Sequence, residues 1–281
     1  MKAAFQTSEQ LLKEVRQALT NSERKLWWLG QSGFLLVQSG RALLLDPYLS
    51  DSLTRKYAET DKPHVRMTKL VVEPAKLGEI GVIDVITSSH GHTDHLDAET
   101  LLPLLAANPH ARLVIPAANR DFVLQRLGTL IASRLVELDD GTSGQVGSME
   151  IQGVASAHPT VERDDKGRCR FLGYVVQWDG LTLYHSGDTL LHESLIPFLQ
   201  RFRIDIALLP INGDKPERRV AGNLNGREAA QLAKAVGAKT VIPCHYDLFE
   251  FNTASPDLFI AECVRVQQAF RILGNGEGLE L

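Results

Sequence analysis

A short segment rich in histidine, Ser89-His90-Gly91-His92-Thr93-Asp94-His95, carries the clearest chemical signal in the sequence. Imidazole and carboxylate side chains together suit zinc, manganese or iron rather than calcium or magnesium. On an extended backbone His90 and His92 project to the same side, so they can bind one ion together. Asp94 and His95 follow at the turn into a predicted helix, where they can reach a second ion. The spacing therefore predicts a metal centre rather than a polar strand end with solvated histidines.

This segment cannot complete two metal sites alone, because each ion needs about four to six donors. Three further residues of suitable chemistry follow predicted strands, namely His158, Asp188 and His245. Taken singly, each of them also fits a structural residue near a strand end. Together with the histidine-rich segment, they predict a composite site at an edge where several strands end.

Short apolar runs, separated by glycine or polar residues, predict the elements that position these donors. In the first half the predicted strands are Lys25–Gly30, Phe34–Gln38, Ala42–Leu45, Asp84–Ser89, Arg112–Pro116 and Arg134–Leu138. In the second half they are Met149–Ser156, Leu172–Trp178, Leu181–His185, Ile204–Pro210 and Lys239–Pro243. Helices are predicted over Ser8–Leu19, Asp97–Ala106, Asn119–Leu127, Arg227–Val236 and Pro256–Gln268.

Runs of strands followed by strand–helix units occur twice, which predicts an α/β fold. Two mixed sheets facing each other with helices outside, a four-layer αββα sandwich, would bury this pattern. No Gly/Ser-rich linker divides the chain, so we expect a helical extension over residues 1–22 and one domain over residues 23–281. The polar stretch Asp46–Lys76 is expected to be a surface loop, in which His64 fits either a solvated residue or a substrate contact.

The composition argues against several classes of protein. The 281 residues carry 30 Lys and Arg against 34 Asp and Glu, a formal net charge of −4, whereas general nucleic-acid and anionic-membrane binders need a basic surface. No apolar run approaches the roughly 18 residues of a membrane span, and the N-terminus lacks the apolar core of a signal peptide. The 3 cysteines are too widely spaced for a disulfide framework. We therefore expect a cytoplasmic protein that acts on a small molecule.

The motifs resemble those of the metallo-β-lactamase superfamily, and the correspondence runs from about Lys25 to Leu273. Within the superfamily, the chain resembles the L-ascorbate-6-phosphate lactonase group. Five motifs carry this closer resemblance: Trp28-Leu29-Gly30-Gln31-Ser32-Gly33-Phe34, Asp46-Pro47-Tyr48-Leu49-Ser50, Leu208-Leu209-Pro210-Ile211-Asn212-Gly213, Gly222-Asn223 with Arg227-Glu228-Ala229-Ala230, and Ile242-Pro243-Cys244-His245-Tyr246-Asp247.

The resemblance implies a centre of two divalent ions held by two groups of three residues and one bridging carboxylate. These are His90, His92 and His158; Asp94, His95 and His245; and the bridging Asp188. A hydroxide between the ions would be the nucleophile, because two cations lower the pKa of bound water. Asp94 would orient this hydroxide and take its proton. Zinc or manganese is expected, with iron as an alternative, and the resemblance implies a homo-oligomer.

Two positions depart from the lactonase pattern. Many members of that group read Asn-Gly-Arg where this chain has Asn212-Gly213-Asp214, although Lys215, Arg218 and Arg219 follow closely. Gly91 also stands where the lactonases tend to carry Asp. Both departures concern the substrate and leave the metal ligands intact. The imidazole of His92, where the flavodiiron branch has a carboxylate, favours hydrolytic chemistry.

Smaller features supply candidates around the metal centre, and each also fits a purely structural role. The substrate-binding candidates are Asn212, Lys215, Arg219 and Tyr246. Asp46 is a candidate to accept a proton from a ligating imidazole, and Asp247 to hold the strand end at His245. A basic pair such as Lys215 and Arg219 would grip a substrate phosphate, or would simply be charge on a solvated loop.

The sequence therefore predicts a metal-dependent hydrolase acting on a lactone or ester. A phosphodiesterase acting on cyclic nucleotides or other small diesters is the first alternative, because the same bimetal site fits either electrophile. A metal-binding sensor or scaffold without turnover is the second. The substrate can be anionic, because two divalent ions would offset much of the formal charge of −4.

Overall fold

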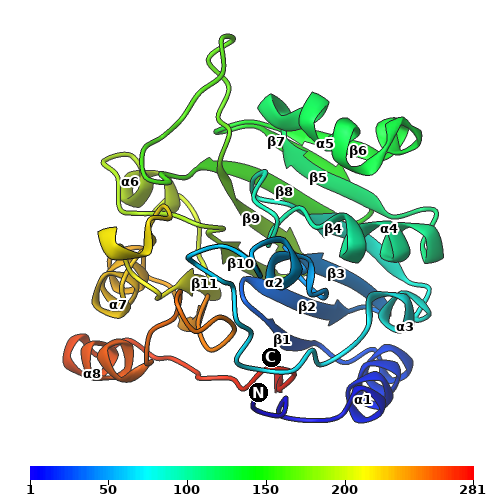
Figure 1. The fold of residues 1–281 in the computed structure, drawn as a ribbon, viewed down its shortest axis with the longest axis horizontal. Helices are drawn as coiled ribbons and strands as arrows, with labels where there is room; N and C mark the ends of the chain where they lie inside the picture. Colours follow the sequence, from blue (N-terminus) through cyan, green and yellow to red (C-terminus); the bar gives the residue numbers. More distant parts are fainter.

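The computed structural model describes residues 1–281 as two β-sheets that face each other, with helices outside each sheet (Figure 1). The first sheet has the strand order β13-β1-β2-β3-β4-β5-β6. Pairing is antiparallel from β13 to β3 and parallel from β3 to β6, so the sheet is mixed. Its strands are β1 Lys25–Gly30, β2 Gly33–Gln38, β3 Arg41–Leu45, β4 Ile83–Thr87, β5 Arg112–Pro116, β6 Leu135–Leu138 and β13 Gly278–Glu280.

The second sheet is also mixed and has the order β12-β11-β10-β9-β8-β7. Parallel pairing joins β12, β11 and β10, and antiparallel pairing continues to β7. The pairs β10–β9 and β9–β8 are both antiparallel, so β8 runs in the same direction as β10 and β12. Its strands are β7 Ser143–Val146, β8 Met149–Ala155, β9 Leu172–Trp178, β10 Leu181–His185, β11 Ile206–Pro210 and β12 Thr240–Cys244.

Helices form the two outer layers on opposite sides of the sheets (Figure 1). The first sheet is covered by α1 Ser8–Asn21, α3 Pro74–Gly78, α4 Ala98–Ala107 and α5 Arg120–Leu127. The second is covered by α6 Leu195–Leu199, α7 Gly226–Ala235 and α8 Asp257–Val266. The short helix α2 Ser52–Lys56 and the 3₁₀ turns η1 Ala117–Asn119, η2 Thr129–Arg134 and η3 Pro216–Arg218 lie in connecting segments.

Alternation along β1 shows how the sequence divides its apolar residues between layers. Leu26 and Trp28 belong to the buried cluster between the sheets, whereas Trp27 and Leu29 belong to the cluster beneath the outer helices. This is the period of two expected of a strand that is buried on both faces. The arrangement confirms the predicted four-layer sandwich, and it leaves the ends of the strands free to carry polar side chains.

The N-terminal helix α1 packs as part of the outer layer. Thr7 caps it, accepting a hydrogen bond from the backbone of Gln10, and Ser8–Asn21 then presents one apolar stripe. The buried residues of this stripe are Leu11, Leu12, Val15 and Ala18. They join the same cluster as the outward face of the first sheet, so the predicted extension over residues 1–22 packs against the domain that follows it.

The stretch Asp46–Lys76, expected to be a polar surface loop, is partly buried and contains the helix α2 and the start of α3. Tyr48 and Leu53 pack with Leu248 and Phe249 in a small apolar cluster of their own. The strands β7 and β13 and the helix α6 were also absent from the sequence prediction. They are short elements of three to five residues, too brief to show a period.

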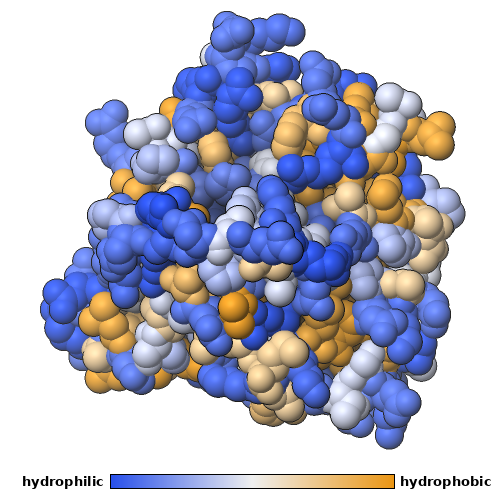
Figure 2. Space-filling view, in the orientation of Figure 1, coloured by the Kyte–Doolittle hydropathy of each residue, from blue (hydrophilic) through white to orange (hydrophobic).

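The molecular surface seen in Figure 2 is mostly hydrophilic, and its apolar side chains form separate patches. No helix is long and apolar enough to cross a membrane.

Candidate metal centre

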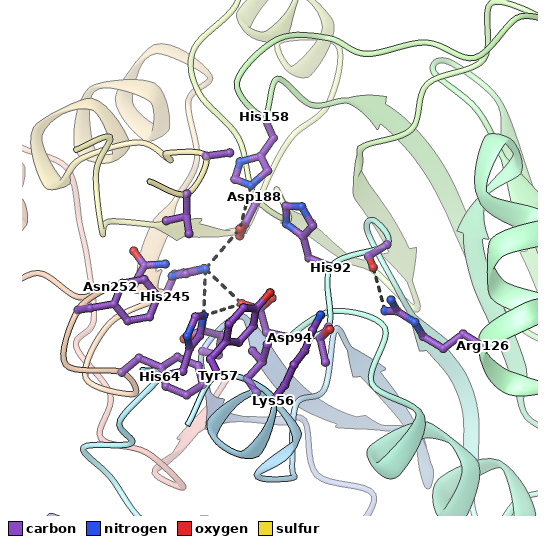
Figure 3. Close-up of a pocket in the computed structure, with 18 of the residues that line it drawn as sticks. Lys56, Tyr57, His64, His92, Asp94, Arg126, His158, Asp188, His245 and Asn252 are labelled. Atoms are coloured by element: carbon purple, nitrogen blue, oxygen red, sulfur yellow. Dashed lines mark hydrogen bonds and ion pairs between the residues drawn. The ribbon is translucent and has the colours of Figure 1, made fainter. Parts of the chain in front are cut away.

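Four loops bring the predicted donors to one edge of the sandwich, and each loop leaves the C-terminal end of a strand. The histidine-rich segment follows β4 in the first sheet. His158, Asp188 and His245 follow β8, β10 and β12, the strands of the second sheet that run in the same direction. Because these ends meet at the same edge, the seven predicted donors come together from both sheets. Figure 3 shows His92, Asp94, His158, Asp188 and His245 where they line the pocket.

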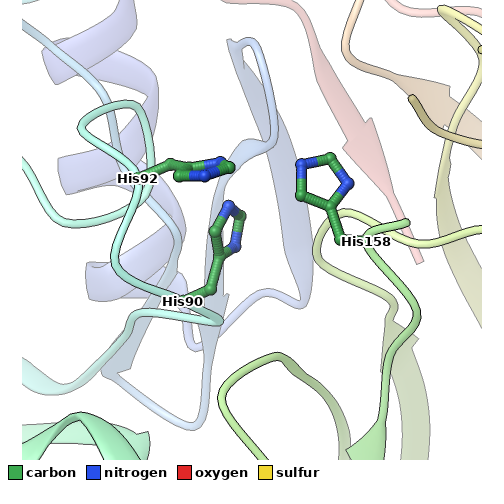
Figure 4. Close-up of side chains that lie close together, drawn as sticks. All are labelled: His90, His92 and His158. Atoms are coloured by element: carbon green, nitrogen blue, oxygen red, sulfur yellow. The ribbon is translucent and has the colours of Figure 1, made fainter. Parts of the chain in front are cut away.

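One group, which we call the imidazole group, consists of His90, His92 and His158 (Figure 4). Their donor atoms lie within 4.8 Å of one another. The Nδ1 atom of His158 is 3.0 Å from the carbonyl oxygen of Gly222, and the Nδ1 atom of His90 is 2.9 Å from the hydroxyl of Ser89. These bonds leave the Nε2 atoms of both rings available, as ligation of an ion requires.

The other group, the mixed group, consists of Asp94, His95 and His245, again with donor atoms within 4.8 Å. His95 and His245 are buried, and Asp94 is only partly exposed to the pocket. The Nε2 atom of His245 lies 3.6 Å from Asp94 Oδ2, and that of His95 lies 3.7 Å from the same oxygen. A carboxylate and two imidazoles therefore converge on one point.

Asp188 connects the two groups. Its Oδ1 lies 3.3 Å from the Nε2 of His95, and its Oδ2 lies 3.3 Å from that of His245. The same Oδ2 lies 3.7 Å from the Nε2 of His158, which belongs to the imidazole group. Asp188 therefore lies between the two groups, where a bridging carboxylate would have to lie.

Buried polar atoms without a partner show how well the donor set fits metal ions. His90 Nε2, His95 Nε2 and Asp188 Oδ1 are buried and make no hydrogen bond. Buried polar atoms are almost always paired, so three unpaired atoms pointing into one cluster indicate that a ligand normally satisfies them. Imidazoles and carboxylates at this spacing fit divalent ions of the zinc, manganese or iron type.

Burial sets the protonation of the imidazole group. It lowers the pKa of His90 well below that of free imidazole, and the neighbouring imidazole of His95 lowers it further. Burial also lowers the pKa of His92 and of His158. All three rings are therefore neutral at physiological pH, which is the form that binds a metal ion.

Charge sets the protonation of the mixed group. Burial alone would lower the pKa of His95, but the carboxylates of Asp188 and Asp94 outweigh it and raise this pKa well above its ordinary value. The pKa of His245 is raised in the same way, mainly by Asp188. Burial opposes ionisation of Asp188, yet His245 and His95 hold the pKa of this carboxyl well below its usual range. Without an ion, the carboxylates therefore favour the protonated form of both imidazoles.

Asp46 holds His95 from behind, as the sequence suggested. Its Oδ2 is 2.7 Å from His95 Nδ1, and both side chains are fully buried. Thr87 Oγ1 and the backbone N–H of Ser89 also donate hydrogen bonds to the Asp46 carboxylate. Asp46 thus fixes the His95 ring so that its Nε2 faces the cluster.

Two residues beside His245 lie differently from their predicted roles. The Tyr246 hydroxyl donates to the carbonyl of Leu273, and its ring stacks on Trp28, so the side chain is buried away from the pocket. The Asp247 carboxylate pairs with Lys2 at 2.6 Å instead of holding the strand end at His245. On a turn with positive φ at His245 and Asp247, adjacent side chains point in different directions.

The predicted basic and amide contacts to substrate are engaged elsewhere. Arg219 pairs with Asp61 at 2.5 Å on the surface, and Lys215 is exposed outside the pocket. Asn212 is buried and donates to Asn252 Oδ1, and it is Asn252 that lines the pocket. Arg218 is also buried, donating to backbone carbonyls. None of these three cations faces the metal centre.

Gln31 was missed as a site residue, although it lies within one of the motifs that carry the resemblance. Its Nε2 is 2.7 Å from Asp94 Oδ2 and 3.0 Å from His245 Nε2. Its backbone carbonyl accepts hydrogen bonds from the His245 N–H and from the Trp28 ring. The first strand pair thereby braces the mixed group, a contact that no local spacing could reveal.

Two glycines allow the site to form. A Cβ on Gly187, whose φ is +57°, would lie 2.5 Å from the Ser89 Cβ, so only glycine lets the Asp188 loop approach the histidine-rich segment. A Cβ on Gly91 would lie 2.8 Å from the ring of Phe122. The apolar ring of Phe122 therefore fills the space beside Gly91.

The donors open into a pocket of about 340 Å³. Donors of both groups line it, together with Gln31, Thr93 and Asn252. The remaining lining is apolar or aromatic, with two basic side chains: Leu53, Lys56, Tyr57, His64, Gly91, Phe122, Arg126, Val220, Ala221, Phe249 and Phe251. The arrangement provides a metal centre that is accessible to a small molecule and flanked by apolar surface.

Residues 25–245 match the family described as the beta-lactamase superfamily domain. This match spans most of the chain and includes all seven donors. The chain therefore belongs to the metallo-β-lactamase superfamily. With its donor set, this family membership makes it a metal-dependent hydrolase.

Individual proteins similar to the chain agree with this class. A UPF0173 metal-dependent hydrolase of Rubrobacter xylanophilus is 27% identical over 245 residues, which cover 84% of this chain and 86% of the relative. Igni18, a metallo hydrolase from Ignicoccus hospitalis, is 21% identical with a TM-score of 0.64, covering 92% and 98% of the two chains. An isothiocyanate hydrolase from Delia radicum gut bacteria is 17% identical with a TM-score of 0.69, at the same coverages. The two solved structures share the fold.

Proposed function

We propose that this hydrolase acts on a lactone or carboxylic ester of a small molecule, with a centre of two divalent ions. The observation that supports the proposal is the joining of the two donor groups through Asp188 beside an open pocket that has both polar and apolar lining. The seven donors would hold the ions. When bound, two ions lower the pKa of a water molecule and polarise the bond to be broken.

The residues of the chain would position the reaction as follows. Burial opposes ionisation of Asp94, but the neighbouring imidazoles, first His95, outweigh it and lower the pKa of Asp94, so the carboxylate is ionised and can accept a hydrogen bond from water. Gln31 holds one oxygen of this carboxylate at 2.7 Å. Asp94 would orient the attacking water and accept its proton. The water oxygen forms a bond to the acyl carbon, the acyl C–O bond breaks, and a proton passes to the alcohol that leaves.

The pocket favours an ester over a sugar phosphate. A phosphate needs several convergent cations, yet Arg218 and Arg219 are engaged elsewhere and Lys215 lies outside the pocket. Of the two basic side chains in the lining, Arg126 donates to backbone carbonyls, which leaves Lys56 alone. Gly91, where the lactonase group tends to carry Asp, is covered by Phe122. The proposal therefore keeps the lactone or ester chemistry of the L-ascorbate-6-phosphate lactonases and replaces the phosphosugar with a less charged substrate.

The proposal is tested on protein purified without added metal, first by elemental analysis and then with an activity panel. The panel contains lactones, carboxylic esters, thioesters, phosphodiesters and an isothiocyanate, the last because of the similar isothiocyanate hydrolase. We expect zinc or manganese, with iron as the alternative, and turnover of a lactone or ester. Asp94→Asn should abolish this turnover while the protein stays folded.

Two outcomes would contradict the proposal in different ways. Turnover of phosphodiesters without turnover of lactones or esters would identify a phosphodiesterase. Two bound metal equivalents with no turnover of any compound would favour a sensor or scaffold. The cytoplasmic location and the homo-oligomer stay predictions, and size-exclusion chromatography with light scattering measures the oligomeric state.

A further inference from the structure

One side of the pocket is formed by a continuous set of apolar and aromatic side chains, here called the aromatic wall: Leu53, Tyr57, His64, Phe249 and Phe251. His64 stacks on Tyr57 with ring centroids 4.1 Å apart, and the ring of Phe251 is 4.3 Å from that of His64. Phe249 meets His64 edge to face at 5.6 Å. Because the rings brace one another, they form a fixed surface instead of independent mobile side chains.

The aromatic wall lies next to the mixed group. Figure 3 places Tyr57 and His64 on the side of Asp94 and His245, with His158 on the far side of the pocket. Burial lowers the pKa of His64 even though the Asp94 carboxylate acts in the opposite direction. The wall is therefore electrically neutral, and a substrate bound against it would lie beside the metal centre.

Lys56 is the basic group available to a substrate on this side. It is exposed, lines the pocket, and makes no ion pair; its Nζ lies 5.1 Å from the Tyr57 ring centroid. The other basic side chain in the lining, Arg126, donates to the carbonyls of Gly91 and Leu96. Arg126 thus holds the histidine-rich segment, which leaves Lys56 to meet an anionic group.

The loop between Tyr57 and His64 is tied to the segment that precedes Val220 and Ala221, two other residues of the pocket lining. Asp61 pairs with Arg219, and Lys62 donates to the carbonyl of Glu217. The basic residue that the sequence offered as a substrate contact therefore positions the loop between Tyr57 and His64. These two contacts hold the loop from the side away from the metal centre.

We infer that the aromatic wall and Lys56 form a subsite for one end of the substrate, which we assign as an apolar, preferably aromatic, group carrying a single carboxylate. The inference rests on the proposed function, because it specifies which lactones and esters the hydrolase takes. Stacking against the aromatic wall would bind the apolar group of the substrate, and the ammonium group of Lys56 would favour a substrate that carries a carboxylate.

The first experiment measures binding without turnover. Metal-loaded protein is titrated by calorimetry with 3-phenylpropionate, with propionate and with uncharged 3-phenylpropanol. We expect 3-phenylpropionate to bind at least about ten-fold more tightly than propionate, because burial of a phenyl ring is worth well over this factor. We also expect it to bind more tightly than 3-phenylpropanol. Equal binding of 3-phenylpropionate and propionate would overturn the inference.

Variants locate the subsite. Phe251→Ala should remove most of the preference for the phenyl ring, and Phe251→Leu should restore part of it. Phe198→Ala, which truncates a half-buried aromatic residue on α6 outside the pocket, is the matched control and should leave the preference intact. An unchanged preference in Phe251→Ala would show that the ring binds elsewhere and would overturn the assignment.

The charge part is tested separately, since a carboxylate could also bind the metal ions. Lys56→Met should weaken the binding of 3-phenylpropionate several-fold without changing the binding of 3-phenylpropanol. Lys69→Met makes the same change at an exposed lysine outside the pocket and should have no effect. If Lys56→Met binds 3-phenylpropionate as the parent protein does, the assignment of a carboxylate to Lys56 is wrong.

These results can be distinguished from failure of the proposed function. If the protein hydrolyses simple lactones but the wall variants bind both acids as the parent does, only the subsite is wrong. If no lactone or ester is hydrolysed but the binding preferences and their loss are observed, the subsite stands and the reaction is of another kind.

Discussion

The two donor groups of the metal centre are built from similar residues but have opposite electrostatics. The imidazole group contains three neutral rings, with pKa values lowered by burial. The mixed group contains a carboxylate and two imidazoles whose pKa values are raised, and Asp188 lies against both imidazoles. The difference teaches that one position can accept an ion without losing protons, whereas the other must release protons as the ion binds.

The difference also has a structural origin. In the imidazole group, His158 is held by a backbone carbonyl and His90 by a neighbouring hydroxyl. In the mixed group, His95 is held by the buried carboxylate of Asp46. A charged partner raises the basicity of the ring and strengthens its bond to an ion, so the mixed group gains affinity at high pH and loses it at low pH.

The largest effect is expected from Asp188, because both groups depend on it. Asp188→Asn should remove most bound metal from both positions and lower kcat by about three orders of magnitude or more. Elemental analysis and steady-state kinetics measure the two quantities, with circular dichroism as the check on folding. Retention of two metal equivalents would show that Asp188 does not bridge the groups.

Single-ligand variants should separate the groups. His158→Ala is expected to remove about one metal equivalent from the imidazole group, and His245→Ala about one from the mixed group, because each leaves its ion with too few donors. Elemental analysis after dialysis gives the metal content of each variant. Unchanged content in His158→Ala would show that this residue is not a ligand, and loss of both ions from either variant would show that the positions fill only together.

The pH dependence of metal affinity should differ between the groups. Because their pKa values are raised, His95 and His245 keep their protons to higher pH than the rings of the imidazole group, so an ion must displace up to two protons. Affinity at the mixed group should then rise by up to about 100-fold per pH unit, whereas affinity at the imidazole group should be nearly constant above pH of about 6.5. Titration with a chelating indicator, using His158→Ala and His245→Ala to isolate each position, measures both slopes. Equal slopes of metal affinity against pH at the two groups would contradict the predicted difference in their electrostatics.

A smaller effect is expected from Asp46, which touches only the mixed group. Asp46→Asn retains the shape of the side chain but removes the charge behind His95. It should lower the affinity of the mixed group for its ion by about 10- to 100-fold and leave the affinity of the imidazole group unchanged. Metal titration of the variant at fixed pH measures this change. An equal loss of affinity for both ions would show that Asp46 maintains the whole edge of the sandwich instead of the His95 ring alone.

Much of the fold was predictable because its determinants are local. Runs such as those of β1, β5, β9 and β10 have the predicted bounds, and Asp97 caps α4 through its bond to Thr100, as its position before the apolar run predicted. The assembly of the seven donors was also predictable, since each donor either lies in one motif or directly follows a strand.

The substrate side of the pocket was not predictable in the same way. Tyr246 and Arg219 have suitable chemistry, but their directions depend on Leu273 and Asp61, which lie far away in the sequence. The aromatic wall is assembled from two segments about 190 residues apart, and its members carry no motif. Tertiary packing decides such contacts, and a single sequence shows only which residue types are available.

Each donor group draws residues from both sheets, and this gives the ions a mechanical role. An ion held by His90 and His158, or by His95 and His245, would join a loop of the first sheet to a loop of the second. The ions would then act as reversible cross-links, stabilising the folded chain by about 2.7 kcal/mol when an ion is present at 100 times its Kd. A chelator should therefore lower the melting temperature of the two sheets together, as well as stopping catalysis.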